Sequence, residues 1–473
     1  MSRPISRSWR TIAGALALAS LATTSVACSG DDDGGDAGAT TATSAPATAA
    51  PTDDTDDTAA PDTTASSDTT ASSDTTGASD TTAAPGDDGE DPYTAFPTYG
   101  PPSGDPMVVG LVNTEGVPGL DFPDIREAIQ GAVDYLDQHG GFGGRPIQLE
   151  TCVSNGSPEG SQSCAQELVG KGVELVMLGL DIFPDYATYG AASVPVIGVL
   201  PILPGDYSAD ALFLTGGNAT VMAAIAVAAH DHFQATSVGI VSADNPGSNS
   251  SEAALTAALD LYGISHVTVK GGDNETDAGF QGLVREATSD DPDLLVSLYS
   301  DAGCISMMRA RASLAIDTPV ITTGICSATE VLEQVGDDAV GWNFAGVSTR
   351  ADTPGSRLLQ EIMAPVLGVE PDAVDQASLG LGALGLFMVM SLATYANDIA
   401  ATGDAVTGAG LSDFLANGDD LKLWPGTQPV DCGASATYPS ICSFTFPFAE
   451  YVAGGEVRTI EGLEAVSVLD HLP

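Results

Sequence analysis

Basic residues are scarce in this sequence. Lys and Arg number 14 against 64 Asp and Glu, and the formal net charge at pH 7 is −50. Proteins that bind nucleic acid need clustered Lys and Arg to neutralise phosphates, and a cationic face is also needed to hold anionic lipid headgroups. We therefore expect neither nucleic acid nor a bare lipid surface among the partners of this protein.

The common local signatures of catalysis are also missing. The sequence contains no G-x-S-x-G, H-E-x-x-H or G-x-x-x-x-G-K-[ST] pattern and only five His. His230 and His232 are two residues apart, so they do not share a helix face, and no C-x-x-C pair is present. We expect no enzyme activity, no cofactor and no metal site. A surface amidase with a triad assembled from distant residues is the enzymatic alternative.

The start of the chain has the pattern of an export signal. Three Arg within the first ten residues precede an apolar run at residues 11–22, which is too short to span a bilayer. The run leads to T-S-V-A-C, which resembles the lipobox of bacterial lipoproteins, with Ser25 where a larger aliphatic residue is usual. The resemblance implies lipidation of Cys28 and anchoring to the outer face of the cell membrane. An ordinary signal peptide is the alternative.

Residues 29–106 hold 17 acidic residues and no basic one. They are mostly Thr, Ala, Ser, Asp, Gly and Pro, with almost no large apolar residue before Tyr93. Such a stretch cannot bury enough apolar surface to offset its ordering entropy, and like charges keep it extended. We interpret it as a disordered tether between the signal, residues 1–28, and a folded region.

Six Cys remain when Cys28 is set aside. An even number of Cys in an exported chain favours disulfides. Fifteen pairings are possible, and pairing of nearest neighbours is the simplest. In sequence order the pairs are Cys152 with Cys164, Cys304 with Cys326, and Cys432 with Cys442.

The folded region alternates apolar runs with stretches of helical spacing, which predicts βαβ units and parallel sheets. Strands are expected at residues 108–112, 146–152, 174–178, 195–200, 237–241, 265–270, 294–298, 319–322 and 342–347. Helices are expected at residues 125–137, 161–170, 184–192, 219–233, 250–262, 278–287 and 305–315. The alternation restarts after a link at residues 211–218. The predicted fold is α/β, with two doubly wound lobes joined by a hinge: residues 107–217 plus about 348–424, and residues 218–347 plus about 425–473.

The pattern G-x-G-x-x-G at residues 380–385 lies inside an apolar run, residues 377–396. A dinucleotide fingerprint needs a preceding strand and a turn that opens a helix, and neither is expected here. The run approaches the length of a membrane span, but no Lys or Arg flanks it. We predict a buried helix that packs against the sheet of the first lobe.

The opening of the folded region resembles a known family. Residues 137–147 read D-Q-H-G-G-F-G-G-R-P-I between a helix and a strand, and residues 173–179 read V-E-L-V-M-L-G. This is similar to type 1 periplasmic binding proteins of the leucine/isoleucine/valine-binding class. The resemblance implies a two-lobed, monomeric solute receptor that delivers a small molecule to the permease subunits of an ABC importer. A sensing receptor with the same fold is the alternative.

Ligands of open parallel sheets bind beyond the carboxyl ends of the strands, and two closing lobes would surround a small solute. This rule selects loop residues in both lobes. They are Thr114, Glu115, Leu180, Asp181, Phe183, Asn245, Ser300, Asp301 and Gly324.

Each of these candidates has an ordinary structural alternative. Asp301 either faces the ammonium group of an amino acid, as the resemblance implies, or caps the next helix. Asp181 either faces the solute, where it would repel a carboxylate, or caps the following helix. Phe183 either stacks on the solute or lies in the core. Asn245 is either a ligand group or part of a turn, and Thr114 with Glu115 could form a solvated loop.

Overall fold

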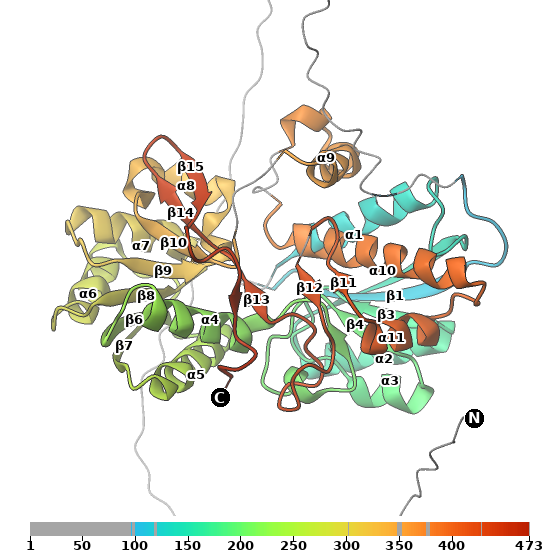
Figure 1. Ribbon diagram of the computed structural model, residues 1–473, viewed down its shortest axis with the longest axis horizontal. Helices are drawn as coiled ribbons and strands as arrows, with labels where there is room; N and C mark the ends of the chain where they lie inside the picture. Colours follow the sequence, from blue (N-terminus) through green and yellow to red (C-terminus); the bar gives the residue numbers. More distant parts are fainter. Residues whose placement is uncertain are drawn as a thin grey trace, which may run out of the picture. The chain divides into compact units, whose positions relative to one another are not determined.

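The computed structural model describes residues 96, 100–117, 121–300, 302–347, 352–374, 379–426 and 428–472. These residues form two α/β lobes, each built on its own sheet (Figure 1). The predicted fold class is confirmed. Cys28 and Asp301 lie outside the described residues.

The first sheet has five parallel strands in the order β2-β1-β3-β4-β5. They are β1 (Met107–Thr114), β2 (Ile147–Ser154), β3 (Leu175–Leu178), β4 (Val196–Gly198) and β5 (Leu212–Phe213). The helices between them are α1 (Pro123–Leu136), α2 (Pro158–Lys171) and α3 (Tyr186–Ala192). Strand β5 lies within residues 211–218, which the sequence indicated as a link. The strand has only two residues, and it extends the edge of the sheet by pairing with β4.

Three later helices complete the first lobe, namely α9 (Pro354–Leu367), α10 (Gly382–Thr402) and α11 (Gly408–Asn417). Their apolar residues share one core with α1 and the first sheet. Helix α10 lies alongside α1 (Figure 1), and this close approach needs Gly385, where a Cβ would lie 2.9 Å from the backbone oxygen of Ile125. Helix α10 is apolar and long enough to cross a membrane, but 61% of its most apolar window is buried. It is therefore a core helix, as predicted.

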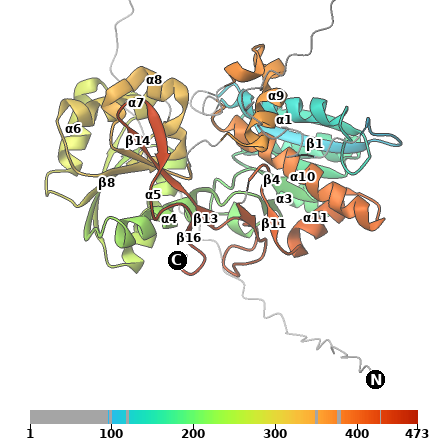
Figure 2. The ribbon, with the colours of Figure 1, turned by 45° about the horizontal axis from the view of Figure 1, so that its top comes forward.

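The second sheet has seven strands in the order β15-β14-β10-β9-β8-β6-β7. Five are parallel: β6 (Ser237–Ala243), β7 (Ser265–Gly271), β8 (Leu294–Leu298), β9 (Val320–Thr323) and β10 (Trp342–Ala345). The other two, β14 (Phe448–Val452) and β15 (Glu456–Thr459), are antiparallel additions from the end of the chain (Figure 2).

Helices cover both faces of the second sheet. Residues alternate along β8, where Val296 faces the core shared with α4 (Gly217–Asp231) and α5 (Pro246–Leu261). Leu295 faces the opposite core, which it shares with helices α6 (Asp277–Ala287), α7 (Ala302–Ser313) and α8 (Thr329–Val335). Helix α4 is buried on nearly all sides, and its core includes residues of both sheets.

The C-terminal segment hydrogen-bonds to strands of both sheets. The backbone N–H of Phe213 in β5 donates to Ser440, and the N–H of Cys442 donates back to Phe213, at 2.8 and 3.0 Å. Further along, β14 pairs with β10. Two short ladders accompany the segment: β11 (Leu421–Lys422) with β12 (Pro429–Val430), and β13 (Thr445–Phe446) with β16 (Val466–Ser467).

Three disulfides are present, and each joins nearest neighbours. Cys152 of β2 bonds to Cys164 of α2, and Cys304 of α7 bonds to Cys326. The third joins Cys432 to Cys442 in the C-terminal segment. The first two cross-links lie close to the carboxyl ends of strands, next to the loops that the sequence selected.

Candidate functional site

The carboxyl ends of β1 and β2 present two buried hydroxyls. Thr114 and Ser154 are register partners at the last position of these parallel strands. Their hydroxyl oxygens lie 2.8 Å apart, and both residues are almost fully buried. The parallel register therefore places two polar side chains together at the edge where, as a rule, open parallel sheets bind ligands.

Asp181 joins this pair from the loop that follows β3. Its Oδ1 accepts hydrogen bonds from Ser161 of α2 at 2.5 Å and from Ser154 at 3.3 Å. Burial of the carboxylate raises the pKa of Asp181, while the serine hydroxyls and the backbone N–H of Phe183 oppose that shift. The interpretation of Asp181 as a helix cap is wrong, because Asp185 caps α3 by accepting from the N–H of Thr188 at 3.2 Å.

Asn113, the residue before Thr114, connects β1 to two neighbouring loops. Its side-chain oxygen accepts from the backbone N–H of Leu180 at 2.9 Å. Its amide donates to the carbonyl of Phe122 at 2.7 Å and to Glu115 at 3.0 Å. Asn113 was not among the candidates that the sequence selected. An amide side chain at the end of an otherwise apolar strand is the signal that could have found it.

Glu115 is held by a bidentate ion pair. Arg126 of α1 donates to its two carboxylate oxygens at 2.7 and 3.2 Å. The side chain of Glu115 is 14% exposed, so the interpretation as a freely solvated loop residue is wrong. The pair places one negative and one positive group beside the end of β1.

A second buried carboxylate lies further along the first lobe. Asp206 accepts from the backbone N–H groups of Ile202 and Leu203, both at 2.8 Å, and from the hydroxyl of Tyr186 at 2.7 Å. Burial, followed by the charge of Asp206, raises the pKa of Tyr186. Sequence reasoning missed Asp206, because only the folded path of residues 202–206 and the approach of Tyr186 identify its partners.

The loop after β3 turns from the interior to the surface at Phe183. Leu180, Asp181 and Ile182 are buried, whereas Phe183 is 37% exposed. Phe183 is therefore not a core residue, and its ring is available at the surface of this loop.

In the second lobe, Asn245 caps helix α5. Its side-chain oxygen accepts from the N–H of Ser248 at 2.9 Å, and its amide donates to Asp273 at 2.8 Å. Ser300 is exposed after β8. Gly324 follows β9, where a Cβ would lie 2.9 Å from the side chain of Val347. Asn245 and Gly324 thus have structural reasons for their residue types.

Tyr299 lies between β8 and Ser300. It is buried, and its hydroxyl donates to the carbonyl of Gly272 at 3.4 Å. Burial and then the nearby acids Glu275 and Asp273 raise the pKa of Tyr299 to about 12. The disulfide between Cys304 and Cys326 ties together the segments that follow β8 and β9.

The groups at these strand ends can donate and accept hydrogen bonds, and they can offer charge to a small polar molecule. The hydroxyls of Ser154 and Ser161 donate to the carboxylate of Asp181 and not to a His, the base that commonly activates a serine nucleophile. Within the part of the chain that the structure describes, no cluster of three or more His, Cys, Asp or Glu could hold a metal ion.

Residues 107–424 match a family model described as periplasmic binding protein. No curated protein matches the sequence.

Solved structures share the fold at low sequence identity. An ABC transporter substrate-binding protein from Sphaerobacter thermophilus is 18% identical, with a TM-score of 0.60 over 78% of this chain and 100% of that one. The branched-chain amino acid transporter substrate-binding protein LivJ from Streptococcus pneumoniae, in complex with isoleucine, is 17% identical, with a TM-score of 0.57 over 75% and 99%. A solute-binding protein from R. palustris, in complex with benzoate, is 14% identical, with a TM-score of 0.55 over 76% and 96%.

Proposed function

The chain belongs to the periplasmic binding protein family, and on this premise we propose that it is an extracytoplasmic solute-binding lipoprotein. It binds a small amino-acid-like or other small polar solute and delivers it unchanged to the permease subunits of an ABC importer. It acts as a monomer and uses no cofactor.

One observation carries the proposal beyond family membership. At the carboxyl ends of β1, β2 and β3, hydroxyl and carboxylate groups form one connected set, from Thr114 through Ser154 to Asp181. This is the edge where open α/β sheets bind ligands. The set is held by hydrogen bonds between elements that are far apart in sequence, so its geometry is fixed before a solute arrives.

The charge of the protein favours a zwitterionic or cationic solute. Residues 107–473 contain 47 acidic and 11 basic residues, and such a field attracts cations and disfavours anions. Glu115 and Asp181 lie at the proposed binding edge, and Phe183 offers an exposed ring for an apolar or cationic group. Related folds hold isoleucine in one protein and benzoate in another, so the fold by itself does not choose the solute.

In this proposal the two lobes close on the solute, and the importer recognises the closed form. A solute that contacts both sets of strand-end loops would bind the closed state more tightly and shift the population toward it. The remaining candidates, Ser300, Asp301, Asn245 and Gly324, would supply the contacts of the second lobe. Cys28 and the acidic tether would keep the protein at the outer face of the membrane.

A thermal-shift panel tests the proposal. The purified chain is heated with each of the standard L-amino acids, amino-acid amides, polyamines, purines and short carboxylic acids. A solute at a concentration of 100 Kd stabilises the folded protein by about 2.7 kcal/mol, which gives a clear rise in Tm. We expect a rise with at least one amino acid or amine. If no panel member raises Tm, the solute-binding proposal fails.

A further inference from the structure

We propose that the disulfide between Cys152 and Cys164 is a positioning element of the binding edge, which fixes the exposed ring of Phe183 through two serines and Asp181. The inference rests on the proposed function, because it concerns the loop that would meet the solute. It concerns a covalent bond that touches no solute itself.

The disulfide and the two serines share one interface. Along β2, Cys152 and Ser154 are two residues apart and so project from the same side of the strand. Along α2, Ser161 and Cys164 are three residues apart and lie on the same buried face. The cross-link holds the two Cα atoms 5.5 Å apart. It therefore fixes the spacing of β2 and α2 close to both serines. Ser154 is two residues from the cross-link along the strand, and Ser161 is three residues from it along the helix.

Both serines donate to the same oxygen of Asp181. The distances to Oδ1 are 2.5 Å from Ser161 and 3.3 Å from Ser154. Asp181 is only 4% exposed, so water cannot easily replace a lost donor, and a buried carboxylate without its donors is costly. The carboxylate is thus held only where strand and helix keep their present separation.

Asp181 lies in the same loop as Phe183, two residues before it. The backbone N–H of Phe183 lies near enough to the Asp181 carboxylate to favour its charged form. Leu180 and Ile182 on either side of Asp181 are buried, whereas Phe183 is 37% exposed. The series from disulfide to serines to carboxylate to backbone therefore determines how this ring is presented.

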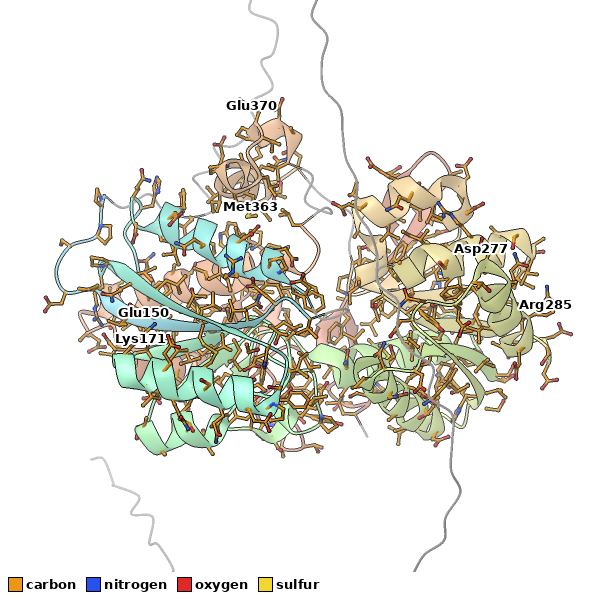
Figure 3. All side chains as sticks on the ribbon, turned by 180° about the vertical axis from the view of Figure 1, so that it is seen from behind. Glu150, Lys171, Asp277, Arg285, Met363 and Glu370 are labelled. Atoms are coloured by element: carbon orange, nitrogen blue, oxygen red, sulfur yellow. A yellow bond between two sulfur atoms is a disulfide. The ribbon has the colours of Figure 1, made fainter. Side chains whose placement is uncertain are left out.

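The interface between β2 and α2 has a second link that offers a control. Glu150 of β2 and Lys171 at the end of α2 lie side by side and form an ion pair at 3.0 Å (Figure 3). Lys171 is at the opposite end of the helix from Ser161. Loss of this exposed pair would loosen the far end of α2 and leave Asp181 with its donors.

Hydrogen exchange of the full chain without solute tests the inference. In the double variant C152S/C164S, we expect the amides of residues 180–183 to exchange about tenfold faster than in the wild type. In the controls Lys171→Gln and C432S/C442S, those amides should keep the wild-type rate. Unchanged exchange in C152S/C164S, or equal acceleration in all three variants, would overturn the proposal.

A coupling measurement separates positioning from general stabilisation. Ser161→Ala is introduced into the wild type and into C152S/C164S, and the pH dependence of Tm is recorded for the four proteins. We expect Ser161→Ala to change that dependence strongly in the wild type and little in the disulfide-free protein. If the effects of Ser161→Ala and C152S/C164S on this pH dependence are additive, the disulfide stabilises the fold without positioning Asp181. If C152S/C164S does not fold, the variant S154A/S161A takes its place, because it keeps the disulfide. The amides of residues 180–183 must then exchange faster than in the wild type. If they do not, the proposal is wrong.

The panel of solutes keeps the two proposals distinguishable. If no panel solute raises the Tm of the wild type, the solute-binding proposal fails, and the exchange result still decides whether the disulfide positions the loop. If a panel solute binds the wild type and binds C152S/C164S with the same Kd, the loop is positioned without the disulfide, and the inference is overturned.

Discussion

The side-chain oxygen of Asn113 accepts a hydrogen bond from the backbone N–H of Leu180 at 2.9 Å, across 67 residues of sequence. This bond fastens the end of β1 to the loop after β3, which carries Asp181 and Phe183. The proposed binding edge of the first lobe is thus connected by side-chain hydrogen bonds as well as by the sheet.

Replacement of Asn113 by Ala should lower the free energy of unfolding by about 1–3 kcal/mol, because buried groups lose their hydrogen-bond partners. The same change should weaken solute binding, since the loop after β3 is freed. Urea unfolding and titration with the panel solute of highest affinity measure both effects. Asn417→Ala removes an exposed amide and serves as the control, with stability and affinity unchanged. Wild-type stability in Asn113→Ala would contradict the assignment.

Asp181→Asn should change the pH dependence of stability. Burial raises the folded-state pKa of Asp181 above its unfolded value. The folded state therefore gains stability from protonated Asp181 below the unfolded pKa of about 3.9 and loses it as pH rises through the folded-state pKa. The Asn side chain carries no such cost, so the Tm of the variant minus that of the wild type should increase as pH rises from 4 to 8. Parallel curves over this interval would show that Asp181 is not a buried carboxylate.

Glu115→Gln should alter solute preference. The change leaves the guanidinium of Arg126 without its bidentate partner and removes a negative charge from the binding edge. Affinity for a zwitterionic or cationic solute should fall about tenfold, which corresponds to about 1.4 kcal/mol. Glu174→Gln is a matched control, because Glu174 forms a comparable pair with Arg145 at 2.6 Å away from the binding edge. Equal losses of affinity in both variants would refute a role for Glu115 in binding.

Gly385→Ala should destabilise the first lobe by about 1–3 kcal/mol through overpacking. The new Cβ would lie 2.9 Å from the backbone oxygen of Ile125 and 3.0 Å from the side chain of Ile129. Gly282→Ala in α6 is the control, because a Cβ there meets nothing within 4 Å. That change should stabilise its helix by up to about 1 kcal/mol. Thermal unfolding of the two variants should therefore shift in opposite directions.

The order of strands and helices was predictable from the sequence, because apolar runs and helical spacing repeat clearly through residues 107–347. The ends of the helices were less predictable. The helix predicted at residues 161–170 begins at Pro158, and Ser157 caps its start. The strands β14 and β15 were missed, because antiparallel additions near the end of the chain do not follow the βαβ pattern. Their pairing with β10 depends on contacts far apart in sequence.

The loops of the candidate site were also predictable, because strand ends in a parallel sheet converge on one edge. The partners of Asp181 were not, because Ser154 and Ser161 lie 27 and 20 residues away in sequence. Only the β2–α2 interface brings them together. The roles of Ser300 and Asp301 in binding stay predictions.

Calorimetric titration with the panel solute that raises Tm most is the most direct test of solute binding. We predict saturable binding with one solute per chain, and recovery of the solute unchanged after the protein is denatured. Failure of every panel solute to give a binding isotherm, or recovery of a chemically altered solute, would contradict the account.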